Sequence, residues 1–279
     1  MNDAGIISVL LFLINLFFTY RGLKDHSFFD AYKFDVDKIL IQKQYKRIIS
    51  SGFLHIGWTH FILNMYTLYA FSSSLELYVG LLPFLIIYFA SLTGGSLFSL
   101  FVHRNHGDYT AVGASGAVSG VVFAAIALFP GMQLGFPFIP IHFPAWLFGL
   151  VYMLYTIYGV RSSRDNIGHE AHLGGAVIGM LTALFFQPAA FTENTFTIFI
   201  IALPTVIFIA FVLLKPQALL IDNLFFKSHD THDSIDHRYN KQKAIRQKEI
   251  DAILDKISRK GINSLSEKEK QKLDDLSQR

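Results

Sequence analysis

The chain contains no cysteine and little charge. None of its 279 residues is Cys, and only 16% are Asp, Glu, Lys or Arg, against about 25% in an ordinary soluble domain. The lack of cysteine excludes disulfide bonds and thiolate chemistry. Because 52% of the residues are hydrophobic, the composition also excludes an ordinary soluble globular protein.

The charge that is present lies in a few places. All 24 Lys and Arg residues fall within residues 21–47, at Arg104, Arg161 and Arg164, or from Lys215 onward. Between them are apolar runs of the length, about 20 residues, that a helix needs to cross roughly 30 Å of hydrocarbon. The mixed charge of the tail is typical of a solvated segment and not of a nucleic-acid surface. We therefore predict an integral membrane protein with several spans, embedded in a lipid bilayer, without a nucleic-acid partner.

Seven apolar stretches are candidate membrane spans. They cover about residues 4–20, 53–73, 81–102, 112–129, 144–160, 168–187 and 196–214. The first lacks the basic start and cleavage site of a signal peptide, so we expect a retained helix. The longest connection, residues 21–52, mixes aromatic and charged side chains, which predicts a segment lying at the membrane interface.

Five polar side chains lie near the starts of alternate spans. Ser115 is near the start of the fourth span and His172 near the start of the sixth, while His55, His60 and Asn64 are near the start of the second. Spans separated by two crossings run in the same direction, so all five lie toward one face at similar depth. Polar side chains inside a bilayer are usually functional, and Ser with His is the smallest nucleophile–base pair.

Each of the fourth and sixth spans carries two glycines, four residues apart, directly after its Ser or His. The pairs are Gly116 with Gly120 and Gly175 with Gly179. Such small-residue faces let helix backbones approach closely in lipid. Close approach of these two helices would bring Ser115 and His172 together.

Each polar residue also has a structural explanation. A serine among small residues is often an interhelical hydrogen-bond partner, and a position near a helix end suits His55 and His169 as interfacial anchors. Asn64 is harder to explain in this way, since an unpaired amide in hydrocarbon costs several kcal/mol. The i, i+4 spacing of His60 and Asn64 puts both on one helix face, from which both could donate into the same small volume.

Three motifs together resemble the rhomboid intramembrane serine proteases. They are His60-x-x-x-Asn64, Gly113-x-Ser115-Gly116 and Ala171-His172-x-x-Gly175, in this order on alternate spans. The segment from Arg47 to His55 resembles the one before the family's second span, and Glu76 and Gly80 fit the short loop after it. The resemblance covers roughly residues 40–187.

The resemblance implies an all-α, polytopic membrane helical bundle. Residues 1–190 would form a six-helix catalytic core, residues 191–217 a seventh, C-terminal transmembrane helix, and residues 218–279 a polar tail with a short helical hairpin. It also implies a serine endopeptidase that cleaves transmembrane segments of other membrane proteins, without a cofactor or a metal ion.

The same resemblance assigns roles to single residues. Ser115 would be the nucleophile and His172 its base, His60, Asn64 and the Ser115 backbone N–H would form the oxyanion hole, and Gly113, Gly116 and Gly175 would allow helix packing at the site. The best-known members have an aromatic residue one turn after the serine, stacked on the catalytic imidazole. Ser119 stands there in this chain. Glu170, two residues before His172, points elsewhere on a helix, so packing must orient the imidazole.

Three alternatives compete with a serine protease, namely a metal site, a transporter or channel, and an inactive member of the family. The string His169-Glu170-Ala171-His172 resembles a zinc-protease signature, but its histidines are at i and i+3, whereas that motif needs i and i+4. A transporter or channel would place charged residues within several spans, yet Glu76 and Glu170 stand at span ends. A catalytically inactive rhomboid-like protein would bind transmembrane helices without cutting them.

The tail shows helical patterns after a polar linker at residues 228–240. Apolar residues repeat at helical spacing between Ile250 and Ile257, and Gly261 is a plausible stop. Ser266-x-x-Glu269 predicts the capping box of a second short helix. The tail is then either a solvated extension or a docking element for a partner or for the membrane surface.

Two indications conflict on orientation. With seven spans, every Lys and Arg lies on the same side as Ser115, which the positive-inside rule makes cytoplasmic. The resemblance instead implies, for bacterial members, an active site that faces outward. We expect a bacterial cytoplasmic membrane, with both orientations open at this point.

Overall fold

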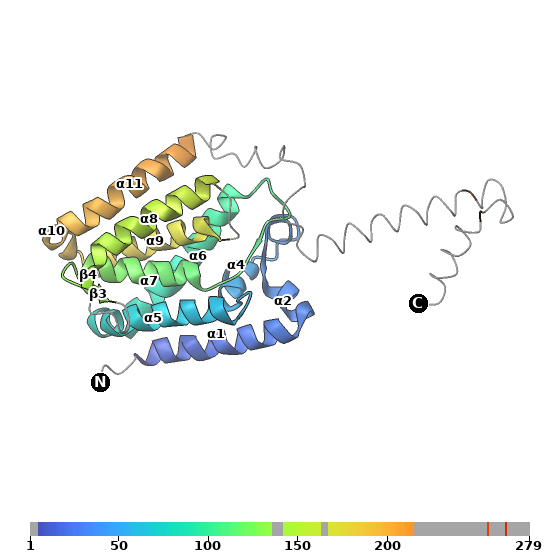
Figure 1. The fold of residues 1–279 in the computed structure, drawn as a ribbon, viewed down its shortest axis with the longest axis horizontal. Coiled ribbons are helices and arrows are strands. Elements are labelled where there is room, and N and C mark those ends of the chain that lie inside the picture. Colours follow the sequence, from blue (N-terminus) through green and yellow to red (C-terminus); the bar gives the residue numbers. More distant parts are fainter. Residues whose placement is uncertain (1–4, 136–141, 163–166, 215–255, 257–265, 267–279) are drawn as a thin grey trace. The chain divides into compact units, whose positions relative to one another are not determined.

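The long helices of the chain lie side by side in a bundle (Figure 1). The structure, a computed structural model, describes residues 5–135, 142–162 and 167–214, together with residues 256 and 266. By contacts the chain divides into two compact units, Met1–Ile221 and Asp222–Arg279. The first unit contains the bundle. The predicted tail hairpin falls outside the described residues, apart from Lys256, which is helical, and Ser266.

Seven long helices of the described ranges overlap the seven apolar stretches. They are α1 (Ile6–Lys24), α5 (Trp58–Val79), α6 (Leu81–Val102), α7 (Ser115–Leu128), α8 (Ala145–Ser162), α9 (His169–Phe186) and α11 (Thr195–Leu214). Among the described residues, three helices are long and apolar enough to cross a membrane, namely Ile6–Lys24, Leu81–Val102 and Thr195–Val212. The expectation of a helical membrane bundle is confirmed, whereas the count of six crossings plus one stays a prediction. The domain limits at 190 and 217 also stay predictions.

The second span differs from its predicted limits at both ends. Its helix, α5, begins at Trp58, because the preceding residues form a 3₁₀ helix, η1 (Ser51–Phe53), and an extended segment that leads to Gly57. It ends at Val79 and is followed by Gly80, which has a φ of +87° that favours glycine. Glu76 therefore lies inside the last turn of α5, and its assignment to a short loop was wrong.

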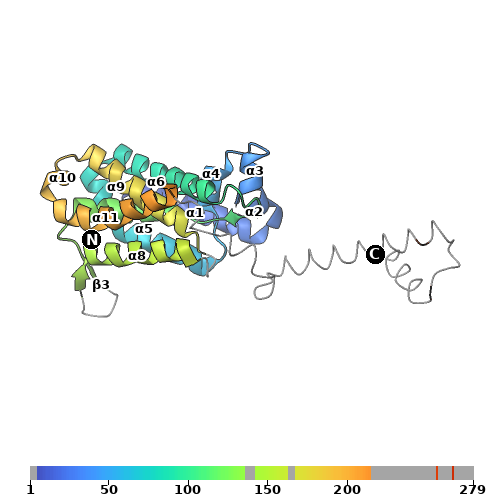
Figure 2. The same cartoon turned by 90° about the horizontal axis from the view of Figure 1, so that it is seen from above.

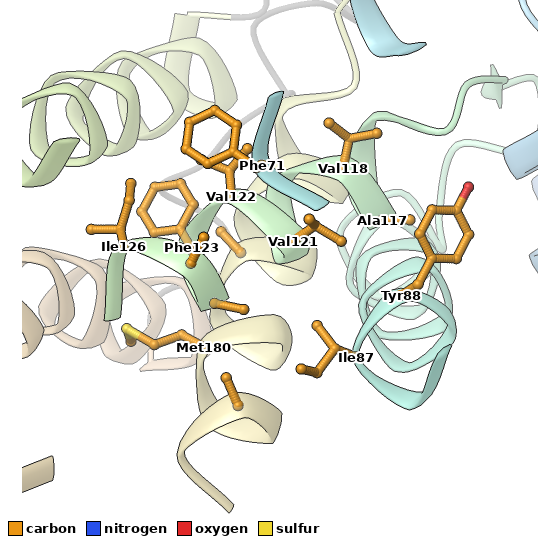
Figure 3. Close-up of a cluster of buried hydrophobic side chains, with 14 of the residues drawn as sticks. Phe71, Ile87, Tyr88, Ala117, Val118, Val121, Val122, Phe123, Ile126 and Met180 are labelled. Atoms are coloured by element: carbon orange, nitrogen blue, oxygen red, sulfur yellow. The ribbon is translucent and has the colours of Figure 1, made fainter. Parts of the chain in front are cut away.

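Helix α7 lies at the centre of the bundle. It packs against α5, α6 and α9, and every one of its residues except Ser115 is buried. Its small and β-branched side chains meet larger ones from the neighbouring helices (Figure 3). The labelled members of this cluster are Phe71, Ile87, Tyr88, Ala117, Val118, Val121, Val122, Phe123, Ile126 and Met180. Burial of this apolar surface fixes the position of the helix that begins at Ser115.

The connection at residues 21–52 is a folded segment. It contains α2 (His26–Tyr32), β1 (Phe34–Asp35), α3 (Val36–Leu40) and α4 (Arg47–Ser50). Phe34, Val36 and Ile39 form a separate small core. Strand β1 pairs antiparallel with β2 (Thr110–Ala111), which attaches the segment to the loop that leads to Ser115.

The remaining elements lie at the other end of the bundle. Strands β3 (Gln133–Gly135) and β4 (His142–Pro144) pair antiparallel, and α10 (Ala190–Glu193) precedes α11. Both views place β3 at the end of the bundle opposite α2 (Figures 1 and 2). The end with α2 is also the end at which α7 and α9 begin (Figure 1).

Candidate active site

Ser115 is the first residue of α7 and follows a tight backbone turn. Gly113 in this turn has a φ of +133°, which residues with side chains rarely adopt. Its N–H donates to the carbonyl oxygen of Ser51 at 3.0 Å, which ties the turn to η1. Ser115 is half-buried and stands where the free N–H groups and the positive end of the helix dipole lie.

The His60 imidazole lies against the bare α-carbon of Gly113. A β-carbon at Gly113 would be 2.7 Å from Cε1 and 2.9 Å from Nε2 of His60, and 3.6 Å from Oγ of Ser115. Any side chain here would therefore displace the imidazole. The structure brings His60 and Ser115 to the same point, and the glycine between them is required by space as well as by its φ.

Asn64 lies one turn after His60 on α5. Its amide nitrogen donates to the carbonyl oxygen of His60 at 3.0 Å, and its side chain is buried. One Asn64 N–H is therefore used within the helix, and the expectation that Asn64 and His60 donate into one shared volume stays a prediction. An amide nitrogen carries two N–H groups, so the second is left for another acceptor.

His55 is not an interfacial anchor, because its side chain is completely buried. Its Nδ1 lies 2.8 Å from Oγ1 of Thr19 on α1, and its Nε2 accepts the backbone N–H of Ala114 at 3.5 Å. Its ring also packs edge-on against His60, with centroids 4.9 Å apart. His55 thus connects α1 to the turn before Ser115.

His172 lies one turn inside α9, with its backbone N–H bonded to the Gly168 carbonyl at 3.2 Å. The residue is half-buried. Its imidazole meets the ring of Tyr152 from α8 at a centroid distance of 6.1 Å and an interplanar angle of 21°. His169 packs edge-on against it at 6.0 Å, and His169 is buried, contrary to its expected place at an interface.

Backbone contact joins α7 and α9 next to Ser115 and His172. A β-carbon on Gly175 would overlap the carbonyl oxygen of Gly116 and lie 2.7 Å from its carbonyl carbon. A β-carbon on Gly116 would in turn lie 3.2 Å from the carbonyl oxygen of Ala171. Gly116 follows Ser115 and Ala171 precedes His172 in the chain, so the helix contact brings Ser115 and His172 into one region.

Glu170 is engaged away from His172. Its Oε1 approaches Nε2 of His103, at the end of α6, to 3.4 Å. The ring of Tyr109 stacks on the His103 ring with centroids 3.6 Å apart. Burial raises the pKa of Tyr109, the Glu170 charge acts in the same direction, and a hydrogen bond with Ser99 opposes them. This arrangement agrees with the inference that Glu170 does not orient His172.

A metal site is the first alternative to a serine protease, because His169, Glu170 and His172 are candidate ligands close together in the sequence. In the ranges that the structure describes, no group of three or more His, Cys, Asp or Glu side chains could hold a metal ion. The histidines at 169 and 172 instead take part in ring packing.

Two features of the site were not found from the sequence. The His55 position was noticed, but its bond to the Ala114 N–H depends on the fold of the turn. Tyr152 gave no local signal, because it is one of three tyrosines in an apolar helix. Its hydroxyl lies 2.8 Å from Oγ of Ser119, at the position where the sequence lacks an aromatic residue.

Three of the described helices are long and apolar enough to cross a bilayer, and a serine, histidines and an asparagine lie at one end of the bundle, so the class is a helical membrane protein with a polar site. The family model described as Rhomboid domain matches residues 42–189. The chain belongs to the rhomboid family, as the three motifs indicated. A second family model, Family of unknown function (DUF6576), matches residues 233–279.

Curated relatives carry the same family name. The chain is 32% identical over 158 residues to Rhomboid protein 1, mitochondrial, of Saccharomyces cerevisiae. The matched segment covers 54% of this chain and 46% of the relative. The chain is 33% identical over 150 residues to RHOMBOID-like protein 12, mitochondrial, of Arabidopsis thaliana, covering 48% and 44%. It is also 33% identical over 138 residues to Presenilin-associated rhomboid-like protein A, mitochondrial, of Danio rerio, covering 48% and 35%. The matched part is less than half of each relative's length.

Proposed function

We propose that the chain is an intramembrane serine endopeptidase that cuts transmembrane segments of other proteins. The observation that supports this most directly is the backbone contact of Gly116 with Gly175. Ser115 on α7 and His172 on α9 lie next to the place where these two helices touch. Rhomboid family membership supports it independently, because the family consists largely of intramembrane serine proteases.

In the proposed reaction, Oγ of Ser115 attacks the scissile carbonyl carbon and passes its proton to the imidazole of His172. The tetrahedral intermediate collapses as the C–N bond breaks, and the imidazolium returns the proton to the leaving amine. A water molecule, deprotonated by the same imidazole, then attacks the acyl ester, and as the bond between the carbonyl carbon and Oγ breaks, the imidazolium returns the proton to Oγ of Ser115. Neither a cofactor nor a metal ion enters the proposed scheme.

The negative charge that develops on the carbonyl oxygen needs donors. We assign this role to the His60 ring, the second N–H of Asn64 and the backbone N–H of Ser115. The proximity of His60 to Ser115, across Gly113, supports this assignment. Loss of one oxyanion donor costs on the order of 10²–10³ in rate, so His60→Ala should lower kcat by about that factor.

The length of α7 supports a site below the membrane surface. Its 14 residues span about 21 Å at 1.5 Å per residue, whereas the hydrocarbon core is about 30 Å thick. If α7 ends at one surface, Ser115 lies roughly 10 Å below the other. Water and a peptide bond could meet there at membrane depth, provided the substrate helix unwinds locally to expose its carbonyl groups.

Cleavage by purified protein in detergent tests the proposal. We expect wild type to cut a model transmembrane substrate, and Ser115→Ala and His172→Ala to be inactive. Ser72→Ala is the matched serine control, because Ser72 is a buried serine elsewhere on α5, and His26→Ala is an exposed histidine control. Equal cleavage by wild type and both site variants contradicts the proposal.

The alternative is a catalytically inactive member of the family that binds transmembrane helices. A serine-directed fluorophosphonate separates the two. An active enzyme is labelled in wild type and not in Ser115→Ala. A wild-type protein that binds transmembrane segments but is never labelled and never cuts them supports the alternative.

The protein's place in the cell is proposed at two levels. Family membership and the apolar helices make it an integral membrane protein. The bacterial cytoplasmic membrane stays a prediction, and relatives named as mitochondrial do not support it. Membrane fractionation decides the compartment, and the accessibility of a C-terminal tag decides orientation and tests the six-plus-one crossing count.

The tail at residues 218–279 is proposed as a docking element for a partner. Its match to a family model of its own, over residues 233–279, supports a role separate from the bundle. Deletion of residues 230–279 should weaken the cleavage of some substrates. Unchanged cleavage of every substrate tested contradicts this role.

A further inference from the structure

The ring of Tyr152 lies in a fixed place between α7, α8 and α9. Its hydroxyl and Oγ of Ser119 are 2.8 Å apart. Phe148 stacks on the ring at 5.9 Å and 25°, and Phe123 packs against it at 5.8 Å and 47°. The imidazole of His172 lies on the ring as well, at 6.1 Å and 21°. Both the distance and the small angle are those of an offset-stacked aromatic pair.

Ser119 stands one turn after Ser115, on the same face of α7. The family resemblance puts an aromatic residue at that position, and a serine there is too short to support the imidazole. The structure shows what the serine contacts instead, since it binds the hydroxyl of a tyrosine from another helix.

We propose that Tyr152 is the positioning residue for His172, with α8 supplying the aromatic ring and Ser119 holding that ring by its hydroxyl. This inference rests on the proposed protease function. Tyr152 touches neither the substrate nor the reacting atoms in the proposed scheme. It acts through the orientation of the imidazole.

The carboxylate two residues before His172 does not supply this orientation. Glu170, the nearest carboxylate in sequence, contacts His103 at the end of α6. An imidazole that must take a proton from Ser115 and return it to an amine has to keep its ring plane throughout the reaction. A nearly parallel ring restricts rotation of that plane, and a hydrogen bond at the far end of the tyrosine keeps the parallel ring in place.

Substitutions separate the contribution of the ring from that of the hydroxyl. Tyr152→Leu removes both, and we expect kcat to fall about ten-fold, near the upper limit for a stacked pair, with KM unchanged. Tyr152→Phe and Ser119→Ala keep the ring and lose the hydrogen bond, so each should lower kcat by a smaller and equal factor. The double variant with Tyr152→Phe and Ser119→Ala should be no slower than either single variant, because both remove the same bond.

Tyr158→Leu is the matched control, since it makes the same change on an exposed face of the same helix. It should leave kcat and KM as in wild type. A Tyr152→Leu protein with the kcat of this control overturns the proposal. So does a Tyr152→Leu effect that is confined to KM, because an imidazole out of place slows the chemical step.

The His172 imidazole signal in NMR gives a readout that does not depend on activity. The signal is assigned by its loss in His172→Ala, and it should move in Tyr152→Leu but not in Tyr158→Leu. A signal that stays in place contradicts the positioning role even if the enzyme proves inactive. If wild type is inactive but the His172 signal moves in Tyr152→Leu, the protease function is contradicted and the contact between Tyr152 and His172 is supported. The two failures are thus distinguishable.

Discussion

Replacing Gly175 by alanine should separate α7 from α9 and slow the proposed reaction. The new β-carbon would overlap the Gly116 carbonyl oxygen and lie 2.7 Å from the carbonyl carbon and 3.1 Å from the α-carbon. These atoms belong to the backbone, so no side chain can rotate out of the way. Non-bonded carbons rest about 3.5–4.0 Å apart, and the helices must therefore move apart by about 1 Å.

The displacement predicts two magnitudes. Because misplacement of reacting groups by about 1 Å can cost on the order of 10² in rate, we expect kcat of Gly175→Ala to fall about 100-fold. Overpacking costs about 1–3 kcal/mol, which the helix preference of alanine over glycine offsets by about 0.5–1 kcal/mol. The free energy of unfolding should fall by about 1–2 kcal/mol.

Cleavage of a transmembrane substrate and thermal unfolding in detergent measure both quantities. Gly149→Ala on α8 is the control, because its β-carbon would meet only side-chain ends, Ile126 Cδ1 at 3.0 Å and Ile201 Cδ1 at 3.2 Å. It should keep wild-type kcat. A Gly175→Ala protein that melts above wild type and cuts at the wild-type rate refutes the reasoning from backbone contact.

Three further substitutions test contacts that hold the bundle. Glu76→Gln removes the buried charge that accepts the first N–H groups of α1, and should lower the free energy of unfolding by about 1–2 kcal/mol in a detergent melt. Arg47→Lys loses the forked bonds to two backbone carbonyls, and should cost about 1–3 kcal/mol and speed proteolysis of residues 26–40. His55→Ala frees the Ala114 N–H and should lower kcat roughly five-fold. Unchanged melting in the first two, or unchanged kcat in the third, contradicts the respective contact.

The helices were largely predictable from the sequence, since length and apolarity alone locate a helix in a bilayer. The third span, residues 81–102, agrees with α6 at both ends. The second span was misplaced at its start. The apolar residues before Trp58 were assigned to the membrane span, but they form a 3₁₀ helix and an extended segment. Hydropathy does not distinguish a buried turn from the first turn of a helix.

The environment of His172 was only partly predictable. The glycine pairs indicated which helices touch, because small residues on one face of a membrane helix let a neighbouring helix backbone approach closely. The missing aromatic residue at Ser119 was visible in the sequence, whereas the ring of Tyr152 that fills its place was not. A contact between residues on different helices depends on how each helix is rotated about its axis.

The sequence by itself determined the class of protein, the approximate positions of its long helices and the family, because composition, span length and three spaced motifs are properties of the chain. Only the tertiary structure decided that Gly113 makes room for His60, that His55 holds the turn before Ser115, and that α8 supplies a ring beside His172. The physical reason is packing. Which backbone surfaces touch, and which side chains fill the space between them, is decided when the helices associate.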